Sequence, residues 1–69
     1  MLFVIMEEAT RVFFENSLYG EEDEFTQNPS EAMQLTEVVA DSVIERLEAI
    51  FLGRTFAKVS IHQLENGEF

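Results

Sequence analysis

The 69-residue chain has no cysteine and no tryptophan, one proline, three glycines and only four lysine or arginine residues. Without cysteine, neither a disulfide framework nor a thiolate metal site is available to stabilise a small core. A chain of this length forms one domain at most, and domains of this size are marginally stable. The sequence therefore predicts a single domain over residues 1–69 that depends on apolar packing.

The scarcity of positive charge limits the classes of partner. Fourteen aspartates and glutamates give a formal net charge of −10. Nucleic-acid backbones and anionic membrane surfaces repel such a chain. Arg54, Lys58 and His62 form the one candidate basic patch, which is too small to offset this charge. We expect no direct contact with nucleic acid or with a membrane.

Long hydrophobic runs are also missing from the sequence. The opening run, residues 1–6, is apolar, but it lacks a basic flank and meets Glu7. A secretory signal needs about 7 to 15 apolar residues behind positive charge, and a membrane span needs about 20. We therefore expect a cytoplasmic protein.

Apolar residues make up 46% of the chain and aromatic residues 12%, which favours a folded domain over an acidic disordered tail. The clearest predicted element is a helix at about 29–52. Asn28 suits an N-cap, Pro29 suits the first helical turn, and Gly53 suits the residue after the helix. Between them an apolar stripe has helical spacing: Leu35, Val39, Val43, Leu47 and Ile50.

Strands are predicted on both sides of this helix. Alternating apolar residues favour a strand at about 55–63, with Ala57 and Val59 on one face and Phe56 on the other. Residues 2–6 favour an N-terminal strand. Residues 7–19 fit either a helix, which we prefer, or the second half of a β-hairpin. The predicted fold class is α+β, one long amphipathic helix on a small antiparallel sheet, with an acidic loop at 20–28 and a frayed tail at 65–69.

Carboxylates are distributed unevenly along the chain. The 34 residues between Arg11 and Arg46 hold nine of them and no cation. On the predicted helix, four acidic residues share one side, opposite the apolar stripe, although like charges at this spacing destabilise a helix. A surface for a basic partner and a merely solvated face both fit this pattern. The predicted partner-binding residues are Glu21, Glu22, Asp23, Glu24, Glu37, Asp41, Glu45 and Glu48.

This charge pattern predicts a small protein-binding inhibitor or regulator. Carboxylates on a rigid helix can imitate the charges of a nucleic-acid backbone, so the expected partner is a basic, nucleic-acid-binding protein. In size and charge the chain is similar to acidic DNA-mimic inhibitors of phages and mobile elements, such as anti-CRISPR proteins. Association with a basic surface would be fast and sensitive to salt.

A second hypothesis is a structural subunit of a homo-oligomer. On the predicted sheet, Phe13, Phe56 and Leu64 are left on the face away from the helix. Exposed apolar patches of that kind mark interfaces. These three residues are the predicted oligomer interface, for a homodimer in the simplest case.

Catalysis and metal binding have little support in the sequence. His62 is the one histidine, and Ser60 lies two residues away on the same face of the predicted strand, about 7 Å from it, too far for a nucleophile–base bond. The acidic run at 21–24 lacks the register of an EF-hand loop. We expect no enzymatic activity, no metal site and no cofactor.

Overall fold

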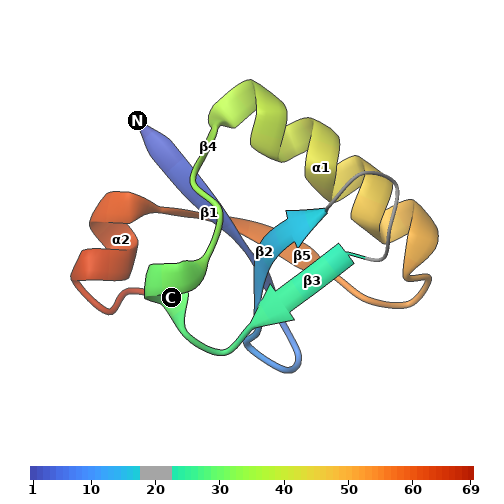
Figure 1. The fold of residues 1–69 in the computed structure, drawn as a ribbon, viewed down its shortest axis with the longest axis horizontal. Coiled ribbons are helices and arrows are strands. Elements are labelled where there is room, and N and C mark those ends of the chain that lie inside the picture. Colours follow the sequence, from blue (N-terminus) through green and yellow to red (C-terminus); the bar gives the residue numbers. More distant parts are fainter. Residues whose placement is uncertain (18–22) are drawn as a thin grey trace.

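The computed structural model describes residues 1–17 and 23–69 and confirms the predicted α+β class (Figure 1). One 14-residue helix packs on a five-stranded sheet whose strands pair antiparallel. In chain order the elements are β1 (Leu2–Glu7), β2 (Phe13–Ser17), β3 (Asp23–Thr26), the 3₁₀ turn η1 (Pro29–Glu31), β4 (Leu35–Thr36), α1 (Glu37–Ile50), β5 (Phe56–Ser60) and α2 (Ile61–Glu65).

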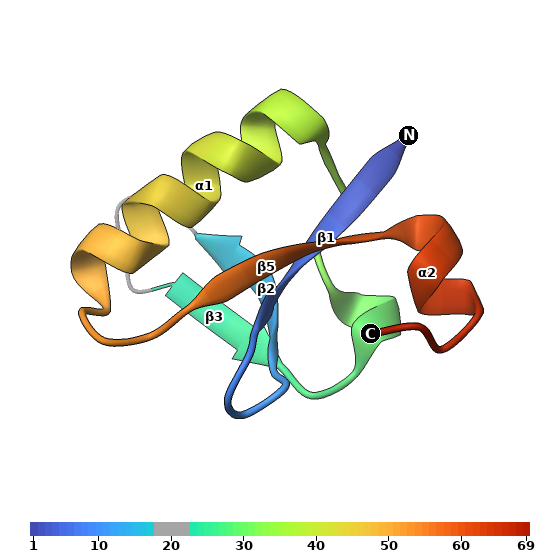
Figure 2. The same ribbon diagram turned by 180° about the vertical axis from the view of Figure 1, so that it is seen from behind.

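The N-terminal strand β1 is the centre of the sheet. β5 pairs with β1 from Phe3 to Glu7, while β2 pairs at Met6 and β4 at Leu2 and Phe3. Since β5 occupies one edge of β1, β2 and β4 share the other edge, and β3 extends the sheet beyond β2. Figure 2 shows β5 and β1 side by side from behind.

Both faces of the sheet are covered, which explains why β1 is apolar at consecutive positions. On one face Ile5 packs under α1, in a core completed by Phe14, Ala40, Leu47 and Phe56. The rings of Phe25 and Phe51 close this core, with Phe25 stacked on Phe56 at 6.1 Å between centroids. On the other face a smaller core lies under α2, formed by Val4, Met6, Phe13, Ala32 and Val59.

The long helix starts later than the sequence predicts, at Glu37 instead of residue 29. Asn28 does cap a helical turn, and its Oδ1 accepts a hydrogen bond from the Ser30 N–H at 3.1 Å, but this turn is the short η1. The chain then becomes extended, and the Met33 N–H donates to the Phe14 carbonyl at 3.0 Å. The segment 33–36 completes the edge of the sheet beside β2, and these sheet hydrogen bonds replace the expected helical ones.

Residues 7–19 form the second half of a hairpin as far as they are described, so the preferred helix was wrong. β1 turns into β2 through residues 8–12, where Arg11 has a positive φ of 61°. The Glu7 N–H donates to the Val12 carbonyl at 2.8 Å. The apolar residues of this segment fit helical spacing because the strand is apolar on both faces. Phe13 packs in one core and Phe14 packs in the other.

The predicted strand 55–63 ends at Ser60, where α2 begins. The Ser60 hydroxyl accepts from the Gln63 N–H at 3.1 Å, and the Gln63 side chain accepts from the Ser60 N–H at 3.0 Å, a capping box. Beyond α2, in the segment predicted as a frayed tail, the Glu68 N–H donates to the Gln63 carbonyl at 2.8 Å. The Phe69 ring lies edge-on to Phe13, with centroids 5.7 Å apart.

Candidate functional site

The buried face of α1 differs from the predicted stripe. Ala40 and Leu47 are buried, whereas the exposed fractions of Val39 and Ile50 are 46% and 56%. The helix is therefore rotated relative to the prediction. Of the four acidic residues of α1, Glu37, Asp41 and Glu48 contact β5 beside the buried face, and exposed Glu45 lies further round the helix. We call this set the α1 carboxylate row: Glu37, Asp41, Glu45 and Glu48.

Lys58 of β5 contacts the row directly. Its Nζ lies 3.1 Å from Glu37 Oε2 and 2.8 Å from Asp41 Oδ1. The Lys58 side chain also lies over the Phe3 ring, 5.5 Å from the centroid. Hydrogen bonds to Asp41 and then Glu37 raise the pKa of Lys58. The two carboxylate side chains stay 62% and 58% exposed, so a partner can still reach them.

Glu48 has a structural role that the sequence does not reveal. Its Oε2 accepts a hydrogen bond from the Phe56 N–H at 3.1 Å. The Glu8 N–H donates to the Thr55 carbonyl, so the backbone polar groups of Thr55 point toward β1. Because these groups alternate in direction along a strand, the N–H of Phe56 points away from β1, at the edge of the sheet. Glu48 therefore satisfies an edge N–H at the start of β5 and is half-buried, while Glu45 is exposed.

The remaining predicted acidic residues do not extend the row. Glu21 and Glu22 lie outside the described residues. Asp23 and Glu24 belong to β3, which lies at the end of the sheet away from β5. Of the predicted residues that the structure describes, those of β3 and those of α1 that contact β5 therefore lie toward opposite ends of the sheet and do not form a single ribbon of negative charge.

The predicted oligomer interface is wrong for both phenylalanines. Phe13 and Phe56 are only 2% and 5% exposed, because each packs in a core of its own chain. Phe56 faces α1, since the helix covers the sheet face opposite to the expected one. Leu64 is half-buried and packs against the core under α2. Within residues 1–17 and 23–69, the exposed large apolar residues are instead Met1, Leu2, Val38, Val39, Ile50, Leu52 and Phe69.

A buried carboxylate at the end of β1 was also missed. Glu7 is 2% exposed, and its Oε2 accepts from the Thr10 hydroxyl and the Thr10 N–H, both at 2.6 Å. These two hydrogen bonds lower the pKa of Glu7. In the sequence, the only sign of this role is a threonine three residues after a glutamate. Such pairs are common, so the spacing alone does not identify a buried carboxylate. Glu7 fixes the hairpin loop and is not available to a ligand.

The geometry does not join the residues considered for catalysis. The Ser60 hydroxyl caps α2, and exposed His62 contacts Asn66, with 3.1 Å between Nε2 and Nδ2. Among residues 1–17 and 23–69, no three His, Asp or Glu side chains are grouped so that they could hold a metal ion.

Comparison with known proteins gives no match to a family model, a curated protein or a solved structure. In the part of the chain that the structure describes, no helix has the length and apolar character that crossing a membrane requires. The site must therefore be interpreted from its own geometry.

Proposed function

We propose that this protein binds a basic surface of a partner protein through the α1 carboxylate row. The single observation that carries the proposal is the row itself, ordered on α1 beside β5. The four carboxylates carry four negative charges, and Lys58 of β5 and Arg46 of α1 carry two positive charges, a local net charge of −2. The expected partner binds nucleic acid, and the protein acts on it as an acidic inhibitor or regulator.

The spacing of the row supports mimicry of a nucleic-acid strand. Glu37, Asp41 and Glu45 follow one another at intervals of four residues, so they span about 12 Å along the helix axis. Over that axial distance one strand of B-DNA carries about three to four phosphates, at about 3.4 Å each. Lys58 holds the first two carboxylates in place, which reduces the entropy that a partner would have to remove.

Decalysine tests the proposal without knowledge of the partner. We expect the triple variant Glu37→Gln, Asp41→Asn, Glu45→Gln to weaken decalysine binding about tenfold in fluorescence anisotropy at low salt, because three neighbouring charges contribute together. The matched control is Glu8→Gln, Glu31→Gln, Glu68→Gln, three exposed carboxylates on other segments. Both variants change the net charge from −10 to −7. Equal weakening by the two variants would show that only net charge matters and would contradict a site on α1.

The partner class has its own test. Proteins captured from a host lysate by the wild-type chain should be released by high salt and by duplex DNA, and should not be captured by the α1 triple variant. Capture that duplex DNA leaves intact would contradict competition for a nucleic-acid site.

Homo-oligomerisation is the second candidate, favoured by a group of exposed apolar residues at the start of α1. Val38 is 77% exposed, Val39 follows it, and Leu2 pairs with Thr36 directly before the helix. A dimer through this surface would be insensitive to salt in ultracentrifugation, and Val38→Asp would convert it to monomer. A monomer at all salt concentrations would exclude this candidate.

A further inference from the structure

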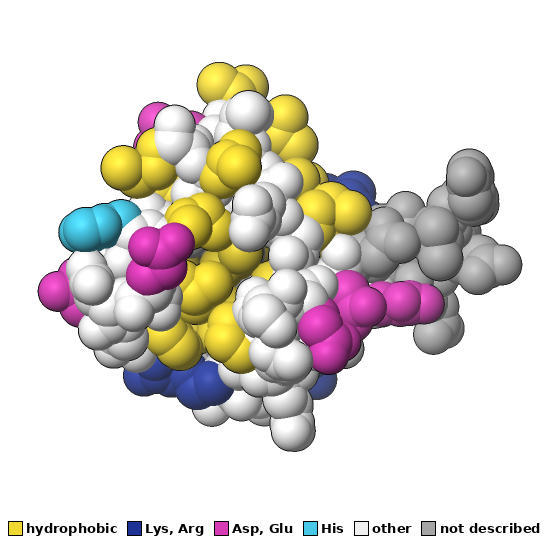
Figure 3. Space-filling model, turned by 60° about the vertical axis from the view of Figure 1, so that its left-hand side comes forward, with side chains coloured by type: hydrophobic (Ala, Val, Ile, Leu, Met, Phe, Trp, Pro, Cys, Tyr) yellow, Lys and Arg dark blue, Asp and Glu magenta, His cyan; other side chains and the backbone are white. Residues whose placement is uncertain are grey.

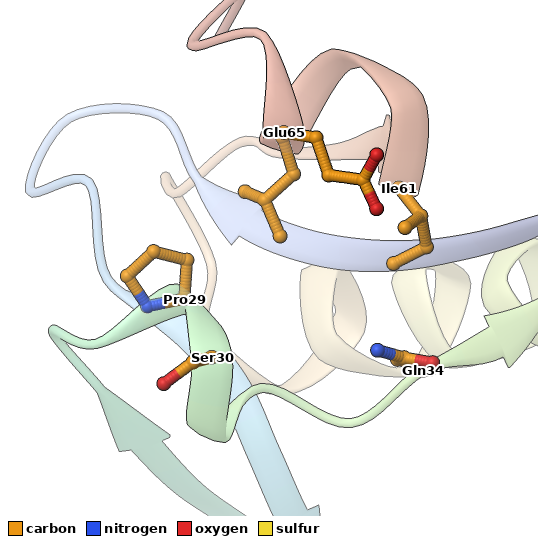
Figure 4. A pocket seen from close by; sticks show the side chains of 6 residues that line it. Pro29, Ser30, Gln34, Ile61 and Glu65 are labelled. Atoms are coloured by element: carbon orange, nitrogen blue, oxygen red, sulfur yellow. The ribbon is translucent and has the colours of Figure 1, made fainter.

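A surface hollow lies between η1 and α2, beside the core that α2 covers. Its volume is about 290 Å³, and it is open to solvent. Figure 4 shows Ile61 and Glu65 of α2 facing Pro29 of η1 and Gln34 across the hollow. The lining residues are Pro29, Ser30, Gln34, Ile61, Leu64 and Glu65.

The hollow follows from how the second core is covered. α2 has only five residues, and it reaches this core through the half-buried side chains of Ile61 and Leu64. Ala32, directly after η1, contributes only a methyl group from the other side. The gap between the two elements is therefore left unfilled. Figure 3 shows hydrophobic side chains at the surface on this side of the molecule, with acidic side chains at the sides and Lys or Arg side chains below.

The polar groups at the hollow are suited to a cation. Of the six lining residues, Glu65 is the one that carries a charge. The Gln34 amide supplies a carbonyl oxygen. The Ser30 hydroxyl donates to Asn28 Oδ1 at 2.8 Å and points away from the hollow in Figure 4, so Glu65 and Gln34 supply the acceptors. Pro29, Ile61 and Leu64 provide apolar contact below these acceptors.

We propose that this hollow binds a lysine side chain of the basic partner, an inference that rests on the proposed function. The four methylene groups would pack against Pro29, Ile61 and Leu64. The ammonium group can donate to the Glu65 carboxylate and to the Gln34 carbonyl oxygen. Lysine side chains commonly bury the stem on apolar surface and keep the charged end at a polar margin. The net charge of −10 attracts the same class of side chain.

Two small probes separate charge recognition from apolar filling. In ¹⁵N NMR titrations, N-acetyl-lysine N-methylamide should shift the amides of Ser30, Gln34 and residues 61–65. N-acetyl-norleucine N-methylamide has an apolar side chain without the ammonium group, and we expect its binding to be about threefold weaker, the equivalent of one exposed ion pair. Equal binding of the two probes, or no shift of these amides by the lysine probe, would overturn the proposal.

Variants at the hollow complete the test. Glu65→Gln should remove the preference for the lysine probe, whereas Glu68→Gln, an exposed carboxylate outside the lining, should retain it. An unchanged preference in Glu65→Gln would contradict the assignment. The α1 triple variant should bind the lysine probe like the wild type. Failure at the hollow and failure of the α1 site can therefore be told apart.

Discussion

The two faces of the sheet are covered in different ways, although β1 contributes buried side chains to both. Under α1, Ile5 and Leu47 are fully buried, and the aromatic rings around them close the core. Under α2, a helix of five residues and the ring of Phe69 cover the core, and the hollow remains open. The first face provides a rigid helix for a charged surface. The second face provides a concave site because its cover is short.

Truncation of one leucine on each face should show this difference most strongly. Leu47→Ala should reduce the free energy of unfolding by about 3 kcal/mol, because it opens a cavity in the sealed core. Leu64→Ala should reduce it by about 1 kcal/mol, since Leu64 is only half-buried. Urea unfolding at constant m-value measures both. Equal losses would mean that α2 seals its core as well as α1 does.

Removal of the edge acceptor on the α1 side should have a smaller effect. Glu48→Ala leaves the Phe56 N–H without the partner it has at 3.1 Å and should reduce the free energy of unfolding by about 1 kcal/mol. Glu48→Gln retains an acceptor oxygen and should lose less. Glu45→Ala, on the same helix and exposed, is the control and should stay within about 0.5 kcal/mol of the wild type. The same loss in both alanine variants would remove the structural role of Glu48.

Glu7, at the hairpin between β1 and β2, should make the free energy of unfolding depend on pH. The lowered pKa of Glu7 means that its charged form stabilises the fold above the ordinary value of 4.5. This contribution is lost as the pH falls through the lowered pKa of the folded state. Urea unfolding between neutral and acidic pH should show a smaller loss in Glu7→Gln than in the exposed control Glu8→Gln. Parallel pH profiles for the two variants would show that the Glu7–Thr10 hydrogen bonds do not contribute.

Substitution of Lys58 should have the smallest effect, a change in decalysine binding alone. Lys58→Gln removes the positive charge that contacts Glu37 and Asp41 and changes the local net charge from −2 to −3. Decalysine binding should become about twofold to fivefold tighter, comparable with one exposed ion pair. Lys58→Arg keeps the charge and should bind decalysine like the wild type. Weaker binding by Lys58→Gln would mean that Lys58 organises the row more than it neutralises it.

Periodicity in the sequence was sufficient for the fold class and insufficient for the element boundaries. Alternation at residues 56–60 and apolar spacing along 37–50 predicted a strand and a helix there, but not which faces of them are buried. Asn28-Pro29 was a genuine cap signal, but long-range pairing of 33–36 with β1 and β2 confined it to one turn. Local signals cannot reveal such pairing, because the partner strand lies about 30 residues away in the chain.

Of the eight predicted partner-binding residues, the four on α1 lie along one helix, but the sequence did not predict where they lie relative to the core. Residues at spacings of four and three on α1 do share one side, as helical geometry requires. The position of that side relative to the core depends on which face of the sheet α1 covers. From the sequence, the face of Phe56 and the face of Val59 were equally apolar candidates for this contact. The contacts between α1 and β5, those of Lys58 with two carboxylates and that of Glu48 with the Phe56 N–H, follow from which face of the sheet α1 covers. The hollow depends on where α2 ends relative to η1, and no residue pattern encodes it.

The most direct test of the central claim is an NMR map of ¹⁵N-labelled protein titrated with decalysine at low salt. We expect the largest amide shifts on residues 37–48 of α1 and 56–60 of β5. These shifts should exceed those of the hairpin loop 8–12, and high salt should abolish them. Shifts in α1 and β5 no larger than those of the hairpin loop would contradict a binding site on the α1 carboxylate row.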